Sequence, residues 1–332
     1  MYKNKNIAVT GGTGSIGSAL VKKLILSDPR SIRILSNDEN GLFELSQELS
    51  NYACLRFLYA DVRDYDRINI AFQDVDFVFH AAAMKHVPIC EYNPFEAHQT
   101  NVIGTENVIR ASLSNNVSKV VTISTDKAVN PSTTMGATKL LAERLTIDGN
   151  NYKGKKSCHF SCVRFGNVLA SRGSVFPIFK KQIESGQELS VTDKDMTRFF
   201  MSIDEAVSLV VKAAEIMKGS ELFILKSQAS VKIMDLARVL IKYFSNDRKI
   251  LIKEIGKRPN EKLYEQLLHK EEKDRAIENK DMFIILPESP SRKDMDYYSA
   301  DLLSKESAYR SDEMSFLTEK EIFQVLKKYD LL

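Results

Sequence analysis

The sequence predicts an α/β protein built on a doubly wound parallel sheet, with a smaller C-terminal α/β domain after it. In the first half of the chain, apolar runs rich in β-branched residues alternate with segments of helical spacing. A glycine-rich stretch, TGGTGSIG at residues 10–17, lies between the first run and the first helical segment. Beyond about residue 170 the alternation stops, and Gly and Pro breaks become more frequent. This pattern is typical of a Rossmann-like fold.

Six runs have the length and composition of buried strands. They span residues 6–10, 31–36, 54–60, 75–83, 119–125 and 159–168. Segments of helical spacing follow at 18–26, 100–113 and around 139–147. In the second half we expect a helix that ends at Gly186, a short strand at 189–192, and amphipathic helices at 203–217 and 232–244.

The composition is that of a globular protein. A length of 332 residues with 43% hydrophobic and 27% charged residues allows one large or two medium domains. The formal net charge is only +3, and acids and bases are interspersed, which argues against a nucleic-acid or membrane partner. No apolar run reaches the roughly 18–20 residues of a membrane span, and the N-terminus lacks a signal-peptide core. Four cysteines without metal-ligand spacing predict a reduced, cytoplasmic enzyme with no metal site.

The stretch TGGTGSIG predicts a dinucleotide-binding turn. Gly11 and Gly14 let the backbone turn and approach a pyrophosphate, while Gly17 lets the next helix pack close to the sheet. The N-terminal end of that helix faces the anion. The predicted cofactor contacts of this turn are Gly11, Thr13, Gly14, Ser15, Ile16 and Gly17.

The end of the second strand bears on the identity of the dinucleotide. An acid there would bind both ribose hydroxyls and favour NAD, whereas Ser36 leaves room for a 2′-phosphate. Asn37 follows where NADP would be expected to meet a cation, which argues the other way; Ser36 decides for NADP as the predicted cofactor, and NAD is kept as the alternative. Asp61 and Val62, after the third strand, are placed to contact the adenine.

These motifs divide the chain into two parts. Residues 1–170 are predicted to form an NADP-binding, Rossmann-like domain, to which segments near 195–225 return. Residues 171–332 are predicted to form mainly a substrate domain that closes over the carboxyl ends of the strands.

The segment STDKAVNPSTTMGATK, residues 124–139, poses the main functional question. Residues four apart share a helix face, so a Tyr-x-x-x-Lys pair would place a phenol beside an ammonium that lowers its pKa. Here Met135 lies four residues before Lys139, and a thioether has no proton to exchange. Either the acid–base work falls to Asp126 and Lys127, or the protein binds a ligand without catalysis.

The motifs resemble those of extended short-chain dehydrogenases/reductases. More narrowly, STDKAVNP, VRFGNVLASRGSVFPIF, TDKDMTRFFMS and GKRPNEKLYE resemble segments of the nucleotide-sugar 4,6-dehydratases of surface-polysaccharide synthesis. The similarity runs from about residue 5 to the final helix. It implies further cofactor contacts from the loop after the fourth strand and from two helices, namely Ala81, Ala82, Ala83, Asn101 and Lys139.

The resemblance implies a UDP-N-acetylglucosamine 4,6-dehydratase that makes a UDP-4-keto-6-deoxy-N-acetylhexosamine for capsule or O-antigen glycans. The segments SRKDMDYY and SDEMSFLTEKEI are most similar to C5-inverting members that lack a membrane anchor. The resemblance also implies a homo-oligomer, either a dimer or a hexamer. Met135 departs from the members that carry a tyrosine.

Such an enzyme moves hydride from C4 of the sugar to nicotinamide, eliminates water across C5 and C6, and returns the hydride to C6. We expect Lys127 to remove the C5 proton and Asp126 to protonate the departing hydroxyl. Lys139 and the oxidised nicotinamide would lower the pKa of Lys127 and keep it neutral. Thr125 would orient the 4-hydroxyl, and Lys139 would hold the nicotinamide ribose. Met135 would either fill core or shape the pocket, and the acceptor of the C4 hydroxyl proton stays open between Asp126 and a water relay.

Polar residues outside this segment are candidates for binding the nucleotide sugar. They are Lys85, His86, Asn167, Arg198, Arg258 and Glu261. Arg198 and Arg258, together with the asparagine, are expected at the diphosphate, because guanidinium forks match phosphate oxygens. Glu261 would accept a hydrogen bond from the uridine ribose. Lys85 would reach the sugar or the cofactor, and His86 would form an aromatic wall or donate a hydrogen bond.

Three other functions are compatible with the motifs. A C5-retaining dehydratase would use the same residues, because the face of reprotonation depends on fine placement. A UDP-sugar 4-epimerase would need no C5 base, so the Asp126-Lys127 pair argues against it. A non-catalytic NAD(P)-binding regulator would account for the absent tyrosine, but it would have no reason to keep both elimination residues.

Overall fold

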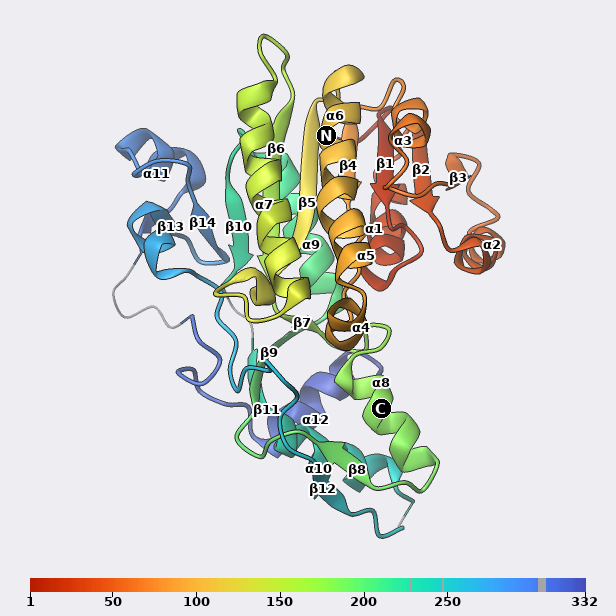
Figure 1. Ribbon diagram of the computed structural model, residues 1–332, viewed down its shortest axis with the longest axis vertical. Coiled ribbons are helices and arrows are strands. Elements are labelled where there is room, and N and C mark those ends of the chain that lie inside the picture. Colours follow the sequence, from red (N-terminus) through yellow and green to blue (C-terminus); the bar gives the residue numbers. More distant parts are fainter. Residues whose placement is uncertain (227–228, 247, 304–308) are drawn as a thin grey trace.

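A ten-stranded sheet forms the larger part of the computed structural model, which describes residues 1–226, 229–246, 248–303 and 309–332 (Figure 1). The strand order is β15-β13-β14-β10-β6-β5-β4-β1-β2-β3. The seven parallel strands are β1 (Asn6–Thr10), β2 (Ser31–Ser36), β3 (Leu55–Tyr59), β4 (Phe77–His80), β5 (Lys119–Thr125), β6 (His159–Phe165) and β10 (Leu222–Leu225). The order reverses between β1 and β4, and the predicted doubly wound α/β fold is confirmed.

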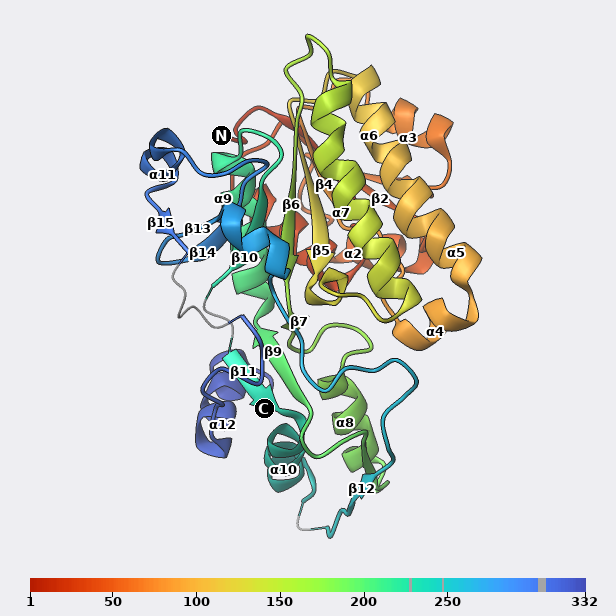
Figure 2. The same ribbon diagram turned by 60° about the vertical axis from the view of Figure 1, so that its left-hand side comes forward.

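Helices cover both faces of this sheet (Figures 1 and 2). Contacts join α1 to α9 on one face, and α3 to α6 and α6 to α7 on the other. The elements are α1 (Ser15–Ile25), α2 (Glu39–Glu48), α3 (Tyr65–Ala71), α6 (Gly104–Ser114), α7 (Thr134–Tyr152) and α9 (Ile203–Ile216). Two short helices, α4 (Val87–Tyr92) and α5 (Pro94–His98), lie between β4 and α6. A π-helical turn, η1 (Gln99–Ile103), leads into α6.

Two predicted strands are shorter in the structure than the sequence suggests. Instead of 75–83, β4 covers only Phe77–His80, so the three alanines that follow form a loop at the carboxyl end of the sheet. Instead of 159–168, the chain leaves β6 at Phe165 and forms the short strand β7 (Asn167–Val168) in another sheet. After β4 the apolar alanines hide the strand end from a pattern of hydrophobicity, and after β6 the chain continues extended into β7, so the change of sheet has no signal in the sequence.

The main sheet also recruits a part of the chain that the sequence did not assign to it. Three antiparallel strands extend it beyond β10, namely β14 (Met282–Ile285), β13 (Ala276–Glu278) and β15 (Asp301–Leu302). Short elements border them: η3 (Lys270–Arg275) and α11 (Arg292–Tyr298). A buried guanidinium fastens this addition, because Arg164 of β6 forms ion pairs of 2.7 Å with Glu143 and 2.8 Å with Glu272. Removal of any one of these three side chains would leave a buried charge without its partner, which destabilises the fold.

The smaller part of the molecule lies below the carboxyl ends of the parallel strands (Figure 2). Its sheets are β11-β9-β7, with β9 (Thr197–Met201) and β11 (Ala229–Lys232), and β12-β8, with β8 (Leu189–Val191) and β12 (Ile252–Glu254). Its helices are α8 (Val175–Glu184), α10 (Ile233–Phe244) and α12 (Glu319–Lys328). A separate hydrophobic core holds these elements together, with Phe179, Ile183, Val239 and Leu326 among its buried members.

A buried histidine lies at the end of a central strand of the main sheet. His80, at the end of β4, is 2% exposed and shares hydrogen bonds of 2.7 Å with the hydroxyl of Thr10 and 3.0 Å with that of Thr105. Burial, assisted by the nearby Lys139 ammonium, lowers the pKa of His80 to about 3. The imidazole is therefore neutral in the folded protein at physiological pH.

This burial predicts a specific loss of stability in acid. The unfolded histidine binds a proton below about pH 6.5, whereas the folded one does so only near pH 3, so the His80 contribution is complete above pH 6.5 and declines below it. We expect the free-energy difference between the wild type and His80→Gln to shrink by about 1.4 kcal/mol per pH unit between about pH 6 and pH 4. Urea unfolding of both proteins measures it, and a pH-independent difference would contradict the prediction.

Candidate active site

The glycine turn forms a close-fitting cradle at the carboxyl end of β1. Gly11 has a positive φ of 64°, and a Cβ atom on it would lie 2.6 Å from the backbone nitrogen of Ala82. A Cβ on Gly17 would lie 2.2 Å from the carbonyl oxygen of Gly11. Gly14 precedes the first residue of α1, so the helix N-terminus opens into this turn. Only residues without side chains fit here, and the arrangement suits a pyrophosphate held by backbone N–H groups.

A groove of about 480 Å³ extends from this turn along the ends of β2 and β3. The hydroxyls of Thr13 and Ser36 share a buried hydrogen bond of 2.7 Å. Asn37 donates a 3.1 Å hydrogen bond to Asp61, whose carboxylate also pairs with Arg63 at 2.6 Å. The predicted cofactor residues Thr13, Ser36, Asn37, Asp61 and Val62 all line this groove.

A larger cleft of about 600 Å³ opens on the other side of the glycine turn and meets the groove there. The predicted residues that line it are Gly11, Gly14, Ser15, Ile16, Gly17, Ala81, Ala83, Lys85, His86, Thr125, Lys127, Met135, Lys139 and Asn167. The 171–174 loop, which leads into α8 of the smaller part, also lines this cleft, so both parts of the molecule contribute to it. A dinucleotide across the turn would therefore have its adenosine half in the groove and its other half beside these side chains.

The turn after β5 presents the candidate acid and base. The Thr125 hydroxyl donates a 2.9 Å hydrogen bond to Oδ1 of Asp126, and the Lys127 ammonium donates another of the same length to that oxygen. Asp126 is fully buried, and its Oδ2 has no hydrogen-bond partner among the described residues. Lys127 also donates to the side-chain oxygen of Asn167 at 3.2 Å. The sequence-predicted acid and base are thus bonded to each other, and Thr125 and Lys127 line the cleft, whereas Asp126 does not.

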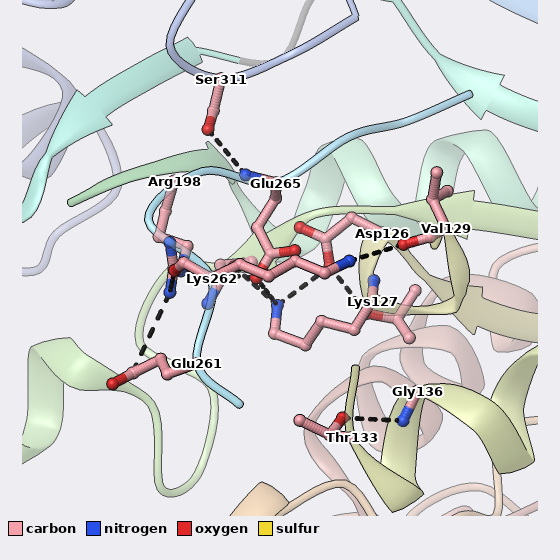
Figure 3. A network of polar contacts seen from close by, with 12 residues as sticks. Asp126, Lys127, Val129, Thr133, Gly136, Arg198, Glu261, Lys262, Glu265 and Ser311 are labelled. Atoms are coloured by element: carbon pink, nitrogen blue, oxygen red, sulfur yellow. Dashed lines mark hydrogen bonds and ion pairs between the residues drawn. The ribbon is translucent and has the colours of Figure 1, made fainter. Parts of the chain in front are cut away.

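A second carboxylate reaches this cluster from a distant part of the chain. Oε1 of Glu265 lies 3.6 Å from the Lys127 ammonium (Figure 3). Burial by itself lowers the pKa of Lys127, but Asp126 and Glu265 outweigh it, and the pKa is raised above the ordinary value of a lysine. The expectation of a lowered pKa is therefore wrong for this structure. That expectation considered the neighbouring cations and missed Glu265.

Met135 and Lys139 lie on successive turns of α7. Met135 is 3% exposed and packs with Cys90 and Ala97 in a small apolar cluster, while it also lines the cleft. Both interpretations from the sequence, core filling and pocket shaping, apply to it. The Lys139 ammonium donates a 2.6 Å hydrogen bond to the carbonyl oxygen of Ile123, and burial lowers the pKa of Lys139. It is thereby held at the end of β5, against the cleft.

The start of α7 is fitted to the Asp126–Lys127 turn. The Thr133 side chain caps the helix by accepting a hydrogen bond of 3.2 Å from the N–H of Gly136 (Figure 3). A Cβ on Gly136 would lie 2.4 Å from the carbonyl oxygen of Lys127. The glycine in Met-Gly-Ala-Thr-Lys therefore permits the helix to approach the turn closely.

The remaining predicted cofactor contacts occupy different positions. Ala81 and Ala83 line both cavities, and Ala82 lines the groove. Asn101, in the π-helical turn, is buried and binds the backbone of Met84 through two hydrogen bonds of 2.8 and 3.1 Å. It shapes the loop that borders the cleft, and it is not among the cleft-lining residues.

The predicted substrate residues divide into two groups. Lys85, His86 and Asn167 line the cleft, and burial lowers the pKa of both Lys85 and His86. Arg198, Arg258 and Glu261 do not line it. Arg198 is 7% exposed and donates to three backbone carbonyls, those of Thr197, Leu263 and Lys262. Arg258 is exposed, and its backbone N–H donates a 3.0 Å hydrogen bond to the side chain of Glu261.

Four residues of the site were missed by the sequence analysis. They are Ser124, Arg172, Lys262 and Glu265. Ser124 lines the cleft with a buried hydroxyl that has no partner among the described residues. Arg172 also lines the cleft, and its guanidinium lies 3.8 Å from Asp38 at the rim of the groove. All four residues stand inside the quoted motifs, Lys262 and Glu265 in GKRPNEKLYE, but only the fold shows that Glu265 reaches Lys127.

The fold, the glycine cradle and the cleft at the end of β5 define the class of protein. It is an extended short-chain dehydrogenase/reductase that resembles nucleotide-sugar 4,6-dehydratases. A family model described as "Polysaccharide biosynthesis protein" matches residues 7–287, and the chain belongs to that family.

Relatives along nearly the whole chain carry several names. An uncharacterized membrane protein of Methanocaldococcus jannaschii is 52% identical over all of this chain and 98% of its own length. A UDP-N-acetylglucosamine 4,6-dehydratase (inverting) of Campylobacter jejuni is 45% identical over 86% of this chain and 84% of its own. A UDP-glucose 4-epimerase of Rickettsia canadensis is 43% identical with the same coverage. In the part of this chain that the structure describes, no helix is long and apolar enough to cross a membrane.

A solved structure shares the complete architecture. Pen from Bacillus thuringiensis is 40% identical, superposes with a TM-score of 0.93, and the match covers 100% of both chains. The similarity therefore includes the smaller part of the molecule as well as the main sheet.

The crowding at Gly11 predicts the effect of a methyl group there. Gly11→Ala combines positive-φ strain with a clash against the Ala82 backbone, so we expect it to lower dinucleotide affinity about tenfold or more, the equivalent of about 1.4 kcal/mol. Gly154→Ala is the matched control, because Gly154 has a φ of 57° and open space around its Cβ position. The control should pay only the strain, about 1–2 kcal/mol of stability, and bind normally in titration calorimetry. Equal affinities would contradict the assignment of the cradle.

Proposed function

We propose that this protein is a UDP-N-acetylglucosamine 4,6-dehydratase that inverts the configuration at C5. The observation that carries the proposal is the bonded series Thr125–Asp126–Lys127 at the edge of the cleft, beside Met135 where a phenol would otherwise act. The Campylobacter relative that is named as an inverting dehydratase supports the substrate and the stereochemistry. The product would be a UDP-4-keto-6-deoxy-N-acetylhexosamine for a capsule or O-antigen type glycan.

The glycine cradle fits the phosphates of a nicotinamide dinucleotide, since Gly11 and Gly17 let the turn pack against the Ala82 backbone and against the start of α1, whose N-terminus opens into it. Bound there, the nicotinamide would accept hydride from C4 of the sugar and return it to C6. Lys139 would hold the nicotinamide ribose, which its position in the cleft and its hydrogen bond to the carbonyl oxygen of Ile123 support.

The Thr125 hydroxyl supplies a path for the C4 hydroxyl proton. It lines the cleft and already donates to Oδ1 of Asp126. Thr125 would accept the proton from the sugar as it passes its own to Asp126, a relay that needs no phenol. Asp126 does not line the cleft, so it would return this proton through the Thr125 hydroxyl to the departing 6-hydroxyl, which leaves as water.

Lys127 would act as the base that removes the C5 proton. Its ammonium must first lose a proton, because the surrounding carboxylates raise its pKa. As the amine, it would accept the C5 proton while the C6 hydroxyl leaves with the proton from Asp126. Return of hydride to C6 and of one proton to C5 completes the balance, and the sugar has lost one water.

A 4-epimerase is the second candidate, favoured by the relatives that bear that name. Epimerisation moves hydride at C4 only and needs no base at C5. Epimerisation removes no C5 proton and expels no hydroxyl, so it would not need the buried Asp126 carboxylate bonded to Lys127, which favours the dehydratase. A non-catalytic regulator is disfavoured on the same grounds.

The placement of the nucleotide is part of the proposal. Lys85, His86 and Asn167 line the cleft and would contact the sugar or the diphosphate. Arg258 and Glu261 would meet the nucleotide only if their loop moved toward the cleft. Cytoplasmic location and assembly as a dimer or hexamer stay predictions.

Incubation with UDP-N-acetylglucosamine in deuterated water tests the proposed reaction. We expect NMR spectra of a 4-keto-6-deoxy product with deuterium at C5 and inverted configuration there, because the C5 proton leaves to Lys127 and solvent replaces it. Retained configuration would refute the inversion. An axial 4-hydroxyl without deuterium would identify an epimerase, and unchanged substrate would favour the regulator.

Replacement of the base separates chemistry from binding. Lys127→Ala should lower the rate of product formation by about 10²–10⁴-fold and leave the dinucleotide bound, because the side chain acts on the sugar. Lys320→Ala, which removes an exposed lysine on α12, is the control. Near-normal turnover of Lys127→Ala would refute the assignment.

NADP is the proposed form of the dinucleotide, with NAD as the alternative. Ser36 places no acid at the 2′ position, and the Arg172 guanidinium beside Asp38 supplies a cation near Asn37. We expect NADP⁺ to bind more tightly than NAD⁺, and Arg172→Ala to remove about tenfold of that preference, since a charge-assisted hydrogen bond contributes about 1.5–3 kcal/mol. Titration calorimetry with both dinucleotides measures it, and equal loss for the two would show that Arg172 does not read the 2′-phosphate.

A further inference from the structure

Glu265 is a buried carboxylate at the edge of the catalytic cluster with no task in the reaction described so far. It is 3% exposed, and its Oε2 has no hydrogen-bond partner among the described residues. Its Oε1 lies 3.6 Å from the Lys127 ammonium and 3.6 Å from Nε of Arg198. A carboxylate is placed in such surroundings at a large desolvation cost, which its two cations must offset.

The backbone of Glu265 is fixed on both sides by one serine. Its N–H donates to the hydroxyl of Ser311 at 3.0 Å, and the N–H of Ser311 donates back to its carbonyl oxygen at 2.9 Å. The Ser311 hydroxyl is itself bonded to that of Thr197 at 2.8 Å, inside β9. The side chain of Glu265 therefore extends toward Lys127 from a backbone that is held in place by Ser311 (Figure 3).

The chain around Glu265 is fastened to the turn that carries Asp126 and Lys127. The Lys262 ammonium donates a 2.7 Å hydrogen bond to the carbonyl oxygen of Val129, which directly follows that turn. Arg198 holds the same segment from the other side through the carbonyls of Lys262 and Leu263. Two further hydrogen bonds cross here, Ser132 to Asn260 at 2.7 Å and Asn130 to Gln266 at 2.9 Å.

These contacts give Lys127 two hydrogen-bond acceptors and one further ion-pair partner, each from a different part of the chain. Asp126 is its neighbour in the chain, Asn167 comes from β7, and Glu265 comes from the 256–268 segment. Hydrogen bonds to Asp126 and Asn167 direct two of the N–H groups of the ammonium, and the charge of Glu265 attracts it from a third side. The two carboxylates also set how readily the nitrogen gives up its proton.

We propose that Glu265 is a positioning residue that holds the Lys127 nitrogen at the cleft and, through its charge, sets the pH at which Lys127 becomes an amine. The proposal rests on the proposed function, because it concerns the base of the dehydratase reaction. It adds a residue that acts through Lys127 and does not line the cleft.

The pH dependence of C5 deuterium incorporation tests this role. If Lys127 reacts as an amine, the wild-type rate rises with pH to a plateau. Glu265→Gln keeps the shape and removes the negative charge, so the ammonium loses its proton more easily and the rising limb moves to lower pH. On that limb, the rate relative to the plateau increases about tenfold for each pH unit of displacement. An unchanged limb would overturn the proposal, because a purely structural role moves the plateau and not the limb.

Two variants control for charge and geometry. Glu271→Gln removes an exposed carboxylate of η3, close along the chain, and should leave the profile unchanged. Glu265→Asp keeps the charge but withdraws it by one methylene, so we expect a lower plateau with a limb near that of the wild type. A limb displaced as far in Glu265→Asp as in Glu265→Gln would also overturn the proposal.

A readout without turnover distinguishes failure of this inference from failure of the proposed function. Urea unfolding of the wild type, Lys127→Met, Glu265→Gln and the double variant measures the coupling between the two charges. We expect the double variant to be more stable than the sum of the single effects predicts, by about tenfold or more in the unfolding equilibrium constant. Coupling without dehydratase activity in the wild type would refute the reaction alone, whereas additive effects would refute the Glu265–Lys127 contact.

Discussion

The ammonium of Lys127 is the point on which the site depends, because it joins the turn after β5 to β7 and to the 256–268 segment. Asp126 binds it at 2.9 Å, and Glu265 approaches it at 3.6 Å from the smaller part of the molecule. The two carboxylates are buried, so the loss of the half-buried Lys127 would leave both without this cation. The β5 turn, the start of α7 and the 256–268 segment are therefore held together. Their fixed arrangement determines the shape of the cleft.

The parallel part of the fold could be predicted because its information is local. Each strand from β1 to β6 is an apolar run, and each connection carries a helical pattern or a glycine turn. The addition of β13, β14 and β15 could not, because those strands are short and depend on contacts with β10 and on the buried Arg164 with its two glutamates. A strand of three residues has no distinguishing period. Its position is decided by its partners.

The same distinction explains the outcome for the site. Thr125, Asp126, Lys127 and Lys139 lie within one continuous segment, so a motif was enough to bring them together. Arg198 was expected at a phosphate because a guanidinium fork suits phosphate oxygens. Backbone carbonyls suit it equally well, and in the structure they occupy its donors. A side chain's chemistry limits its possible partners, but only the path of the backbone decides which partner is reached.

Met135 illustrates how a missing functional group can be consistent with activity. A phenol at this position would stand one helical turn from Lys139, and its acidity would depend on that ammonium. The Lys139 ammonium is already committed to the carbonyl of Ile123, and Met135 packs into an apolar cluster with Cys90 and Ala97. The Thr125 hydroxyl lines the same cleft and is bonded to an acceptor, Asp126. If the C4 proton follows this bond, one turn of backbone contains every proton transfer of the elimination, and the helix that carries Met135 is left to position the cofactor and close the pocket.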